Sequence, residues 1–270
     1  MTLDTITRDG LVMLGCGKMG TAMLTSWLKQ GMTTDRVWVV DPQPSAWLQA
    51  SGVHLNAELP PDPAVILVAV KPQMMGQALP RIARYGGGGS LVISVAAGTT
   101  IATFEAALGP GTRMIRAMPN TPAAIGKGLT AIIGNAAATA ADGALADALL
   151  QAVGQVVRLE TEDQIDAVTG VSGSGPAYVF CMIDALAAAG VAEGLPEAMA
   201  MRLAKATVAG AGALADTAAD TPAQLRINVT SPNGTTQAGL EVLMDEAAGL
   251  APLIRRTVAA AAHRSRELKG

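Results

Sequence analysis

The sequence has few of the residues that build metal centres and disulfide frameworks. Among its 270 residues there are two cysteines, Cys16 and Cys181, and two histidines, His54 and His263. Two isolated cysteines provide no disulfide framework, and none of these four residues stands at a spacing typical of metal ligands. We therefore expect no metal site and interpret both cysteines as small buried side chains.

Charge is scarce as well. Charged residues make up 15% of the chain, and the formal net charge is −3 without any run of Lys or Arg. This composition argues against nucleic acid and against a membrane as partners. The longest uncharged run, residues 85–104, holds too many Gly, Ser and Thr residues for a membrane span. The N-terminus shows no signal-peptide pattern, so we expect a cytoplasmic location.

What the sequence does contain is a glycine motif after an apolar run, in residues 11–20 (LVMLGCGKMG). An apolar strand, Gly-x-Gly-x-x-Gly and then an amphipathic helix form the dinucleotide-binding fingerprint. The first glycine permits a tight turn, the second lets a pyrophosphate approach the backbone, and the third lets the helix pack on the strand. The pyrophosphate would bind the free N–H groups at the start of that helix. The predicted cofactor contacts here are Gly15, Gly17, Lys18, Met19 and Gly20.

Three glycines also arise by chance in structural turns, so the context of the motif decides. A second predicted strand, residues 36–40, ends in Asp41, roughly 20 residues after Gly20, where an acidic side chain accepts hydrogen bonds from the adenosine ribose. No Lys or Arg follows between residues 42 and 53 to pair with a 2′-phosphate. We expect a nicotinamide cofactor, NAD(P)H, with NADH slightly favoured.

Further predicted strands cover residues 64–70, 91–95 and 112–118, and a helix is predicted over about residues 73–84. In a parallel sheet, ligands bind beyond the carboxyl ends of the strands. Lys71 could equally be a solvated charge. Asn120 stands between two prolines, in a stiff turn that either presents its amide to the nicotinamide carboxamide or is a plain turn. The residues predicted to border the cofactor from these loops are Val70, Lys71, Pro72, Ala97, Gly98 and Asn120.

The pattern changes near residue 160, since only helical periodicity follows. We predict an α/β fold, with a Rossmann-like N-terminal domain that has a mostly parallel sheet (residues 1–160) and an all-α C-terminal domain (161–270). The helix expected to begin at Pro176 is apolar nearly all round, with Asp184 its one charged residue before Glu193. Such a helix needs cover on all sides, so we expect it to be shared between subunits of a dimer.

A second informative stretch is residues 228–236 (NVTSPNGTT). Ser231 is a good N-cap and Pro232 suits the first helical position, so a helix is expected to start there. Its free N–H groups and neighbouring hydroxyls could bind a carboxylate without any Arg. A well-capped helix without a ligand is the alternative.

The order of motifs resembles the pyrroline-5-carboxylate reductase family. The matching segments are GCGKMG at 15–20, VKPQ at 70–73, SVAAG at 94–98, MPNTP at 118–122, AVTGVSGSGPAY at 167–178 and QLRINVTSPNGTT at 224–236. The resemblance implies a Rossmann-like domain, a helical dimerisation domain, and an active site between them at the subunit interface. It also implies the reaction, which is reduction of the C=N bond of L-1-pyrroline-5-carboxylate to L-proline by hydride transfer from NAD(P)H, the last step of proline biosynthesis.

The resemblance also implies roles for single residues. Thr236 corresponds to the threonine that hydrogen-bonds the ring nitrogen of the substrate, and Ser231, Gly234 and Thr235 fall where the substrate carboxylate binds. Lys71 and Asn120 match cofactor-contacting positions. The family often prefers NADPH, from which Asp41 departs. The oligomer implied is a homodimer or a larger assembly of dimers.

The implied chemistry suits the residues present, because a cyclic imine protonated at nitrogen is already electrophilic and requires no strong acid or base. Two alternatives remain. A β-hydroxyacid dehydrogenase would carry a catalytic Lys on the helix after Ser172–Gly175, but the first lysine there is Lys205. A regulator that binds the dinucleotide without turnover would not need the hydroxyl cluster near Thr236. The sequence leaves open whether related cyclic imines are accepted.

Overall fold

The chain forms two compact units. The computed structural model describes residue 6 and residues 8–269. Unit 1 comprises the chain up to Gly173 and the segment from Ala262 onward, and unit 2 is Ser174–Ala261. The sequence pattern predicted the boundary near residue 160. In the structure, unit 1 also includes residues 161–173. The reason is that Ile165 and Asp166 are buried against unit 1 and hold this stretch there.

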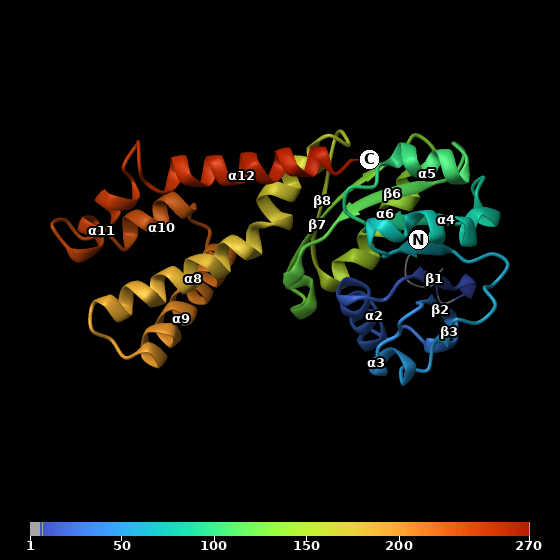
Figure 1. Ribbon diagram of the computed structural model, residues 1–270, viewed down its shortest axis with the longest axis horizontal. Helices are drawn as coiled ribbons and strands as arrows, with labels where there is room; N and C mark the ends of the chain where they lie inside the picture. Colours follow the sequence, from blue (N-terminus) through green and yellow to red (C-terminus); the bar gives the residue numbers. More distant parts are fainter. Residues whose placement is uncertain (1–5, 7, 270) are drawn as a thin grey trace. The chain divides into compact units, whose positions relative to one another are not determined.

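Unit 1 contains an eight-stranded, mostly parallel sheet (Figure 1), as predicted. The strand order is β3-β2-β1-β4-β5-β6-β7-β8, with β6 and β7 antiparallel and the other pairs parallel. Strands β2 and β3 lie on one side of β1, and β4 and the following strands lie on the other side. A ligand crevice is expected at such a switch point, between β1 and β4. The strands are β1 (Leu11–Leu14), β2 (Val37–Val40), β3 (His54–Leu55), β4 (Val65–Val68), β5 (Leu91–Ser94), β6 (Met114–Met118), β7 (Gly128–Gly134) and β8 (Gly154–Arg158).

Helices cover both faces of this sheet. One face packs against α2 (Lys18–Lys29), α3 (Ala46–Gln49) and α6 (Ala140–Leu150). The other packs against α4 (Met75–Ile82) and α5 (Ile101–Leu108). The inner strands are apolar without alternation because both of their faces are buried. The indole N–H of Trp27 also joins α2 to α6, since it donates to the carbonyl of Leu149 at 2.8 Å.

Two local differences from the sequence prediction concern weak signals. The strand β3 was not predicted, because two residues are too short to show a pattern. The helix expected over residues 73–84 is broken up into a 3₁₀ turn at Pro72–Met74, the α-helix α4 and a second 3₁₀ turn at Ala83–Tyr85. Pro80 lies inside α4, where it removes one backbone donor from the helix.

Unit 2 is built from helices alone in its described part, as predicted. It contains α8 (Gly175–Ala192), α9 (Glu197–Thr217), α10 (Pro222–Asn228), α11 (Thr235–Leu243) and most of α12 (Leu250–Glu267). The pair α8 and α9 is in close contact, since a Cβ on Gly190 would lie 3.2 Å from the Cβ of Ala200. Small residues at this crossing let the two helices approach each other.

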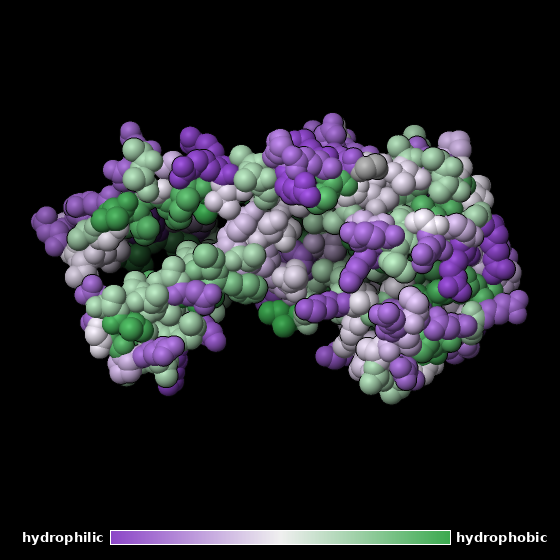
Figure 2. Space-filling model, viewed as in Figure 1, coloured by the Kyte–Doolittle hydropathy of each residue, from purple (hydrophilic) through white to green (hydrophobic). Residues whose placement is uncertain are grey.

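Large apolar side chains are exposed on α8 and α9, among polar ones (Figure 2). Phe180 is 59% exposed, and the other exposed apolar side chains of α8 and α9 include Val179, Met182, Leu186, Met199 and Leu203. An exposed apolar surface of this size marks an interaction site. The helical stretch Gln164–Ala192 is also long and apolar enough, with a mean hydropathy of 1.5, to cross a membrane. Length and composition alone are weak grounds for a span, and the shared helix expected from the sequence accounts for the same surface.

Candidate cofactor and substrate sites

The glycine loop has the geometry that a dinucleotide requires. Gly15 has φ +82°, and a Cβ there would lie 2.9 Å from the carbonyl oxygen of Ala69, so both backbone conformation and space demand glycine. A Cβ on Gly20 would lie 3.1 Å from the carbonyl oxygen of Gly15. A Cβ on Gly17 would meet nothing within 4 Å. The fold therefore needs two of these glycines, whereas the third leaves open space where a pyrophosphate would approach.

Gly17 is also the N-cap of α2, and no side chain caps this helix end. The first N–H groups of a helix have no partner within the helix. Lys18 and Met19 form the first turn, with Lys18 exposed and Met19 half-buried. An anion at this end would accept hydrogen bonds from backbone N–H groups and meet the positive end of the helix dipole.

Asp41 lies next to the glycine loop. Its Oδ2 accepts a hydrogen bond from the backbone N–H of Cys16 at 2.7 Å, and its Oδ1 accepts one from Gln43 at 2.8 Å. The side-chain amide of Asn56 accepts a hydrogen bond from the backbone N–H of Asp41 at 3.0 Å and donates one to its carbonyl at 2.9 Å. These contacts fix the carboxylate at the end of β2, and each of its oxygens keeps a lone pair for a ribose hydroxyl.

A pocket of about 120 Å³ opens beside Asp41, at the carboxyl ends of β1, β2 and β4. Its lining is mainly apolar, which suits the flat ring of an adenine. Arg81 reaches this pocket from α4. Arg81 was not predicted, because it lies about 40 residues after Asp41, outside the loop of residues 42–53 in which a cation that pairs with a 2′-phosphate is expected. The lining residues are Leu14, Val40, Pro42, Val70, Met74, Gln77, Ala78 and Arg81.

The other predicted cofactor residues lie in loops after the neighbouring strands. Val70, Lys71 and Pro72 follow β4, where Lys71 is exposed and caps the 3₁₀ turn that precedes α4. Ala97 and Gly98 form a turn after β5, with Ala97 exposed and Gly98 at φ +76°. The structure thus brings these five residues to the carboxyl edge of the sheet, the edge at which the glycine loop also lies.

Asn120 has a different set of contacts from the one expected. Its amide nitrogen donates to the carbonyl and hydroxyl oxygens of Ser172, at 3.2 and 3.1 Å, and its Oδ1 accepts from the N–H of Leu129 at 2.9 Å. The side chain therefore joins the turn after β6 to the π-helical segment Thr169–Gly173. A contact with the nicotinamide carboxamide stays a prediction, which competes with these bonds.

The candidate substrate turn lies in unit 2. The helix expected from Ser231 begins later, at Thr235, and its N-cap is Gly234. Ser231 starts a turn instead, because Gly234 donates to its carbonyl at 3.0 Å and Asn233 adopts φ +58°. A Cβ on Gly234 would lie 2.3 Å from the Oγ of Ser231, so a larger residue here would displace this hydroxyl.

The turn at residues 231–234 and the start of α11 together have the features that suit a carboxylate. Thr235 and Thr236 are the first two residues of α11, both exposed, and the first N–H groups of that helix have no acceptor within it. Gln237 reaches back and accepts from the N–H of Asn233 at 2.8 Å, which fixes the turn. Three hydroxyls, of Ser231, Thr235 and Thr236, accompany these N–H groups at a positive helix end.

The Cys16 thiol in the glycine loop is not a base at neutral pH. Burial raises the pKa of the Cys16 thiol, more than its contact with Thr21 lowers it, so the thiol stays protonated at neutral pH. Among residues 6 and 8–269, no three His, Cys, Asp or Glu side chains gather where they could hold a metal ion. The site can bind and orient, which suffices for a reaction whose electrophile and reductant arrive with the ligands.

Comparisons with known proteins cover both the candidate cofactor site and the candidate substrate turn. A family model described as pyrroline-5-carboxylate reductase dimerisation matches residues 162–268. A second model, described as NADP oxidoreductase, coenzyme F420-dependent, matches residues 11–98. The first covers the apolar helices of unit 2 and the candidate substrate turn, and the second covers the glycine loop, Asp41 and the loops after β4 and β5.

Whole-chain relatives carry the same name. The pyrroline-5-carboxylate reductase of Pseudomonas aeruginosa is 38% identical over 264 residues, which is 96% of each chain. The solved structure of the Coxiella burnetii reductase has a TM-score of 0.91 at 31% identity and covers 97% of this chain and 99% of its own. The Plasmodium falciparum pyrroline carboxylate reductase with NADP bound has a TM-score of 0.82 at 26% identity, over 98% and 99% of the two chains. The chain therefore belongs to the pyrroline-5-carboxylate reductase family.

Proposed function

We propose that this protein reduces the C=N bond of L-1-pyrroline-5-carboxylate to give L-proline, with NAD(P)H as the reductant. The observation that carries the proposal is the turn at residues 231–236, where three hydroxyls and a helix start form a carboxylate site without a cation. The same chain holds a glycine loop with open space at Gly17. Related cyclic imino acids with a carboxylate at the same position would fit the same turn.

The residues present match what each ligand needs. The cofactor supplies a hydride from its nicotinamide ring when bound. The glycine loop binds its pyrophosphate, and the mainly apolar pocket beside Asp41 takes its adenine ring. Lys71, Ala97 and Gly98 border the part of the sheet edge assigned to the nicotinamide. Restricting the motion of these groups supplies most of the rate gain, since no bond to the protein forms or breaks.

In unit 2, we assign the carboxylate of the substrate to the N–H groups at the start of α11 and to the hydroxyls of Ser231 and Thr235. Thr236 accepts a hydrogen bond from the protonated imine nitrogen through its hydroxyl oxygen. This contact orients the ring and favours the charged, electrophilic form of the C=N bond. After hydride addition the same hydroxyl bonds the amine of proline.

We expect the replacement of Thr236 by Ala to lower kcat/KM for the imine by roughly 10- to 100-fold, because one orienting hydrogen bond is lost. Thr236→Ser keeps the hydroxyl and serves as the matched control, with activity close to that of the parent chain. The measurement is the loss of nicotinamide absorbance with pyrroline-5-carboxylate. Unchanged kinetics in Thr236→Ala would remove this residue from the site.

NADH is the cofactor that Asp41 favours. Its carboxylate is held at the end of β2 by two backbone N–H groups, so a 2′-phosphate placed there would meet a fixed like charge. The counter-argument is Arg81, a cation at the adjoining pocket, together with the NADP named for the Plasmodium relative. Asp41 stands at the ribose position itself, whereas Arg81 lines the adjoining pocket, so NADH stays the slight favourite.

Asp41→Asn tests this choice. We expect the ratio of kcat/KM for NADPH to that for NADH to rise by about 10-fold, because the neutral amide removes the repulsion at nearly constant volume. Arg81→Met should change the same ratio in the opposite direction. A ratio that Asp41→Asn leaves constant would assign the selectivity to other groups.

The proposed function also bears on the oligomeric state and the cellular location of the protein. The apolar face of α8 and α9 belongs to the segment that matches the family's dimerisation model, which supports a homodimer or a larger homo-oligomer built from dimers. We place the protein in the cytoplasm, since the proposed reaction draws on free NAD(P)H. Cell fractionation followed by an activity assay would test that location.

A further inference from the structure

The C-terminal residues of the chain return to unit 1 and contact the loop after β5. The carbonyl oxygen of Leu268 would lie 2.9 Å from a Cβ on Gly98, so the backbone of the C-terminal segment lies directly against this loop. Gly98 adopts φ +76°, a conformation in which other residues are strained. The close approach and the glycine conformation occur at the same position of the SVAAG motif.

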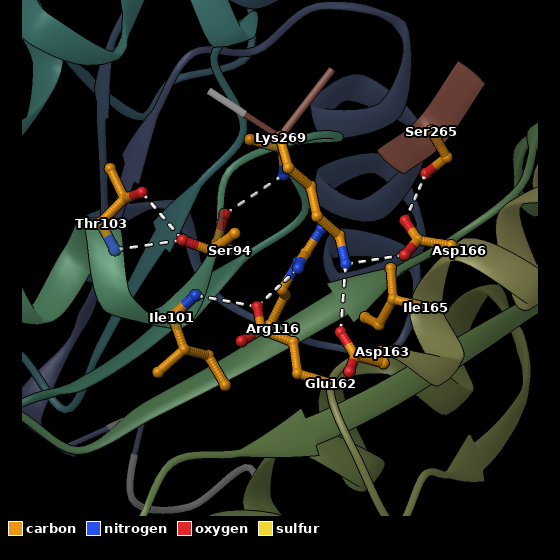
Figure 3. Close-up of polar contacts among 12 residues, drawn as sticks. Ser94, Ile101, Thr103, Arg116, Glu162, Asp163, Ile165, Asp166, Ser265 and Lys269 are labelled. Carbon is orange, nitrogen blue, oxygen red and sulfur yellow. Dashed lines mark hydrogen bonds and ion pairs between the residues drawn. The ribbon is translucent and has the colours of Figure 1, made fainter. Parts of the chain in front are cut away.

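An ion cluster around the buried Asp166 holds the C-terminal segment in place (Figure 3). The ammonium group of Lys269 lies 2.7 Å from Oδ2 of Asp166 and 3.4 Å from Oδ1 of Asp163. Ser265 donates from its hydroxyl to Oδ1 of Asp166 at 2.8 Å. The side chain of Asp166 is 3% exposed and that of Lys269 is 20% exposed, so this pair is shielded from solvent and salt.

Asp166 is charged at neutral pH in spite of its burial. Burial raises the pKa of its carboxyl group, but the hydrogen bonds from Lys269 and Ser265 outweigh burial, and the pKa lies below its ordinary value. A lowered pKa means that the cluster stabilises the fold above the unfolded pKa of about 4 and loses this effect as the pH falls further.

The same loop is also held from its other end. Glu162 accepts a hydrogen bond from the N–H of Ile101, the first residue of α5, at 2.9 Å, and pairs with the buried Arg116 at 2.5 Å. The loop of residues 95–100 is therefore held at two points, one within it at Gly98 and one directly after it at Ile101. The contact at Gly98 comes from Leu268, about 170 positions later in the sequence.

We propose that Ser265, Leu268 and Lys269 form a C-terminal strap that positions the loop of residues 95–100 for the nicotinamide end of the cofactor. The strap residues are positioning residues, since they act through Gly98 and touch no ligand. The proposal rests on the proposed function in so far as that function assigns Ala97 and Gly98 to the cofactor. A chain without the strap keeps its sheet and its substrate turn but holds the loop loosely.

Lys269→Met removes the charge that anchors the strap. We expect the Kd for NADH, measured by fluorescence, to rise roughly 5- to 20-fold. The KM for the imine should stay within about two-fold, because the substrate turn contains no strap residue. Lys269→Arg, which keeps the charge, should restore most of the affinity. A chain ended at Glu267, without the strap residues Leu268 and Lys269, should behave like Lys269→Met.

The chain offers a matched control. Arg264 lies on the same last turns of α12 and pairs with Glu267 at 2.7 Å, but both side chains are exposed and neither contacts Asp166. Arg264→Met should leave the Kd for NADH unchanged. An equal rise in Kd for Arg264→Met and Lys269→Met would overturn the proposal, as would an unchanged Kd for a folded Lys269→Met chain.

Amide hydrogen exchange gives a readout that requires no cofactor. Residues 95–101 should exchange faster in Lys269→Met than in the parent chain, with the amides of the β1 and β4 strands unaffected. Equal exchange in this loop would overturn the strap. A parent chain that binds NADH without reducing pyrroline-5-carboxylate would instead overturn the proposed function, and the strap would still be judged by Kd and exchange.

Discussion

At the residue scale, the glycine loop separates what the fold needs from what a ligand needs. Gly15 and Gly20 meet backbone atoms at close range, so the protein itself requires them. Gly17 faces open space, and nothing within the protein forbids a side chain there. A ligand that approaches this backbone would explain why the position is left bare.

Substitution of these glycines by Ala tests the separation. Gly15→Ala should destabilise the fold by at least about 2 kcal/mol, because it adds a clash at 2.9 Å to a φ of +82°. Gly17→Ala should change the free energy of unfolding by less than about 1 kcal/mol, yet raise the Kd for NADH by roughly 10-fold or more. Thermal unfolding and NADH titration measure the two effects. A Gly17→Ala chain that binds NADH normally would contradict the assignment of the pyrophosphate to this loop.

At the element scale, Asn120 connects the turn after β6 with the segment Thr169–Gly173 and with β7. Three hydrogen bonds from one amide, at 2.9 to 3.2 Å, tie these elements together. The connected segment leads directly into α8, at the point where the chain leaves unit 1. Asn120 thus has a structural role that its place between two prolines does not reveal.

Asn120→Ala distinguishes this role from cofactor binding. We expect a loss of about 2 to 3 kcal/mol in the free energy of unfolding, because the N–H of Leu129 and the Ser172 groups lose their partner. Urea unfolding gives this value, and Thr121→Ala in the same turn is the control. Full stability combined with weaker NADH binding would favour the carboxamide contact.

The sequence indicated most elements of unit 1 because its buried strands are continuous apolar runs. The start of α11 was predicted at Ser231, since Ser followed by Pro is a typical helix start. The structure begins this helix at Thr235, because Asn233 takes a left-handed conformation and closes a turn before it. Local preference alone does not show that a turn competes for the same residues.

Contacts between distant segments were the part that the sequence could not show. Asp41 was expected near a ribose, but its bond to the N–H of Cys16 depends on how β1 and β2 pair. Arg81 and the pair of Lys269 with Asp166 come from elements far apart in the chain. Periodicity and spacing describe neighbours in sequence, so such contacts appear only once the sheet is assembled.

At the scale of the whole molecule, the apolar surface of unit 2 requires a partner. Phe180, Met182 and Leu186 on α8 are exposed and would be costly to leave in water. They lie within residues 162–268, which match the dimerisation model. Aromatic residues make up only 3% of the chain, so an aromatic side chain exposed on α8 is a strong indication of an interaction surface there.

Phe180→Asp should therefore weaken or abolish the dimer, because a charge would be buried in an apolar interface. Sedimentation velocity at micromolar concentration gives the oligomeric state. Asp184→Ala, on the same helix, is the control and should leave the assembly intact. A Phe180→Asp chain with the parent sedimentation coefficient would place the interface elsewhere.

The proposed reaction transfers a hydride directly from the nicotinamide C4 to the imine carbon. The measurement that tests it uses pyrroline-5-carboxylate and NADH doubly deuterated at C4, with analysis of the proline by mass spectrometry and NMR. We predict one deuterium per proline, located at the δ carbon, and one NAD⁺ formed per proline. Unlabelled proline, or NADH binding without any proline, would contradict this hydride transfer.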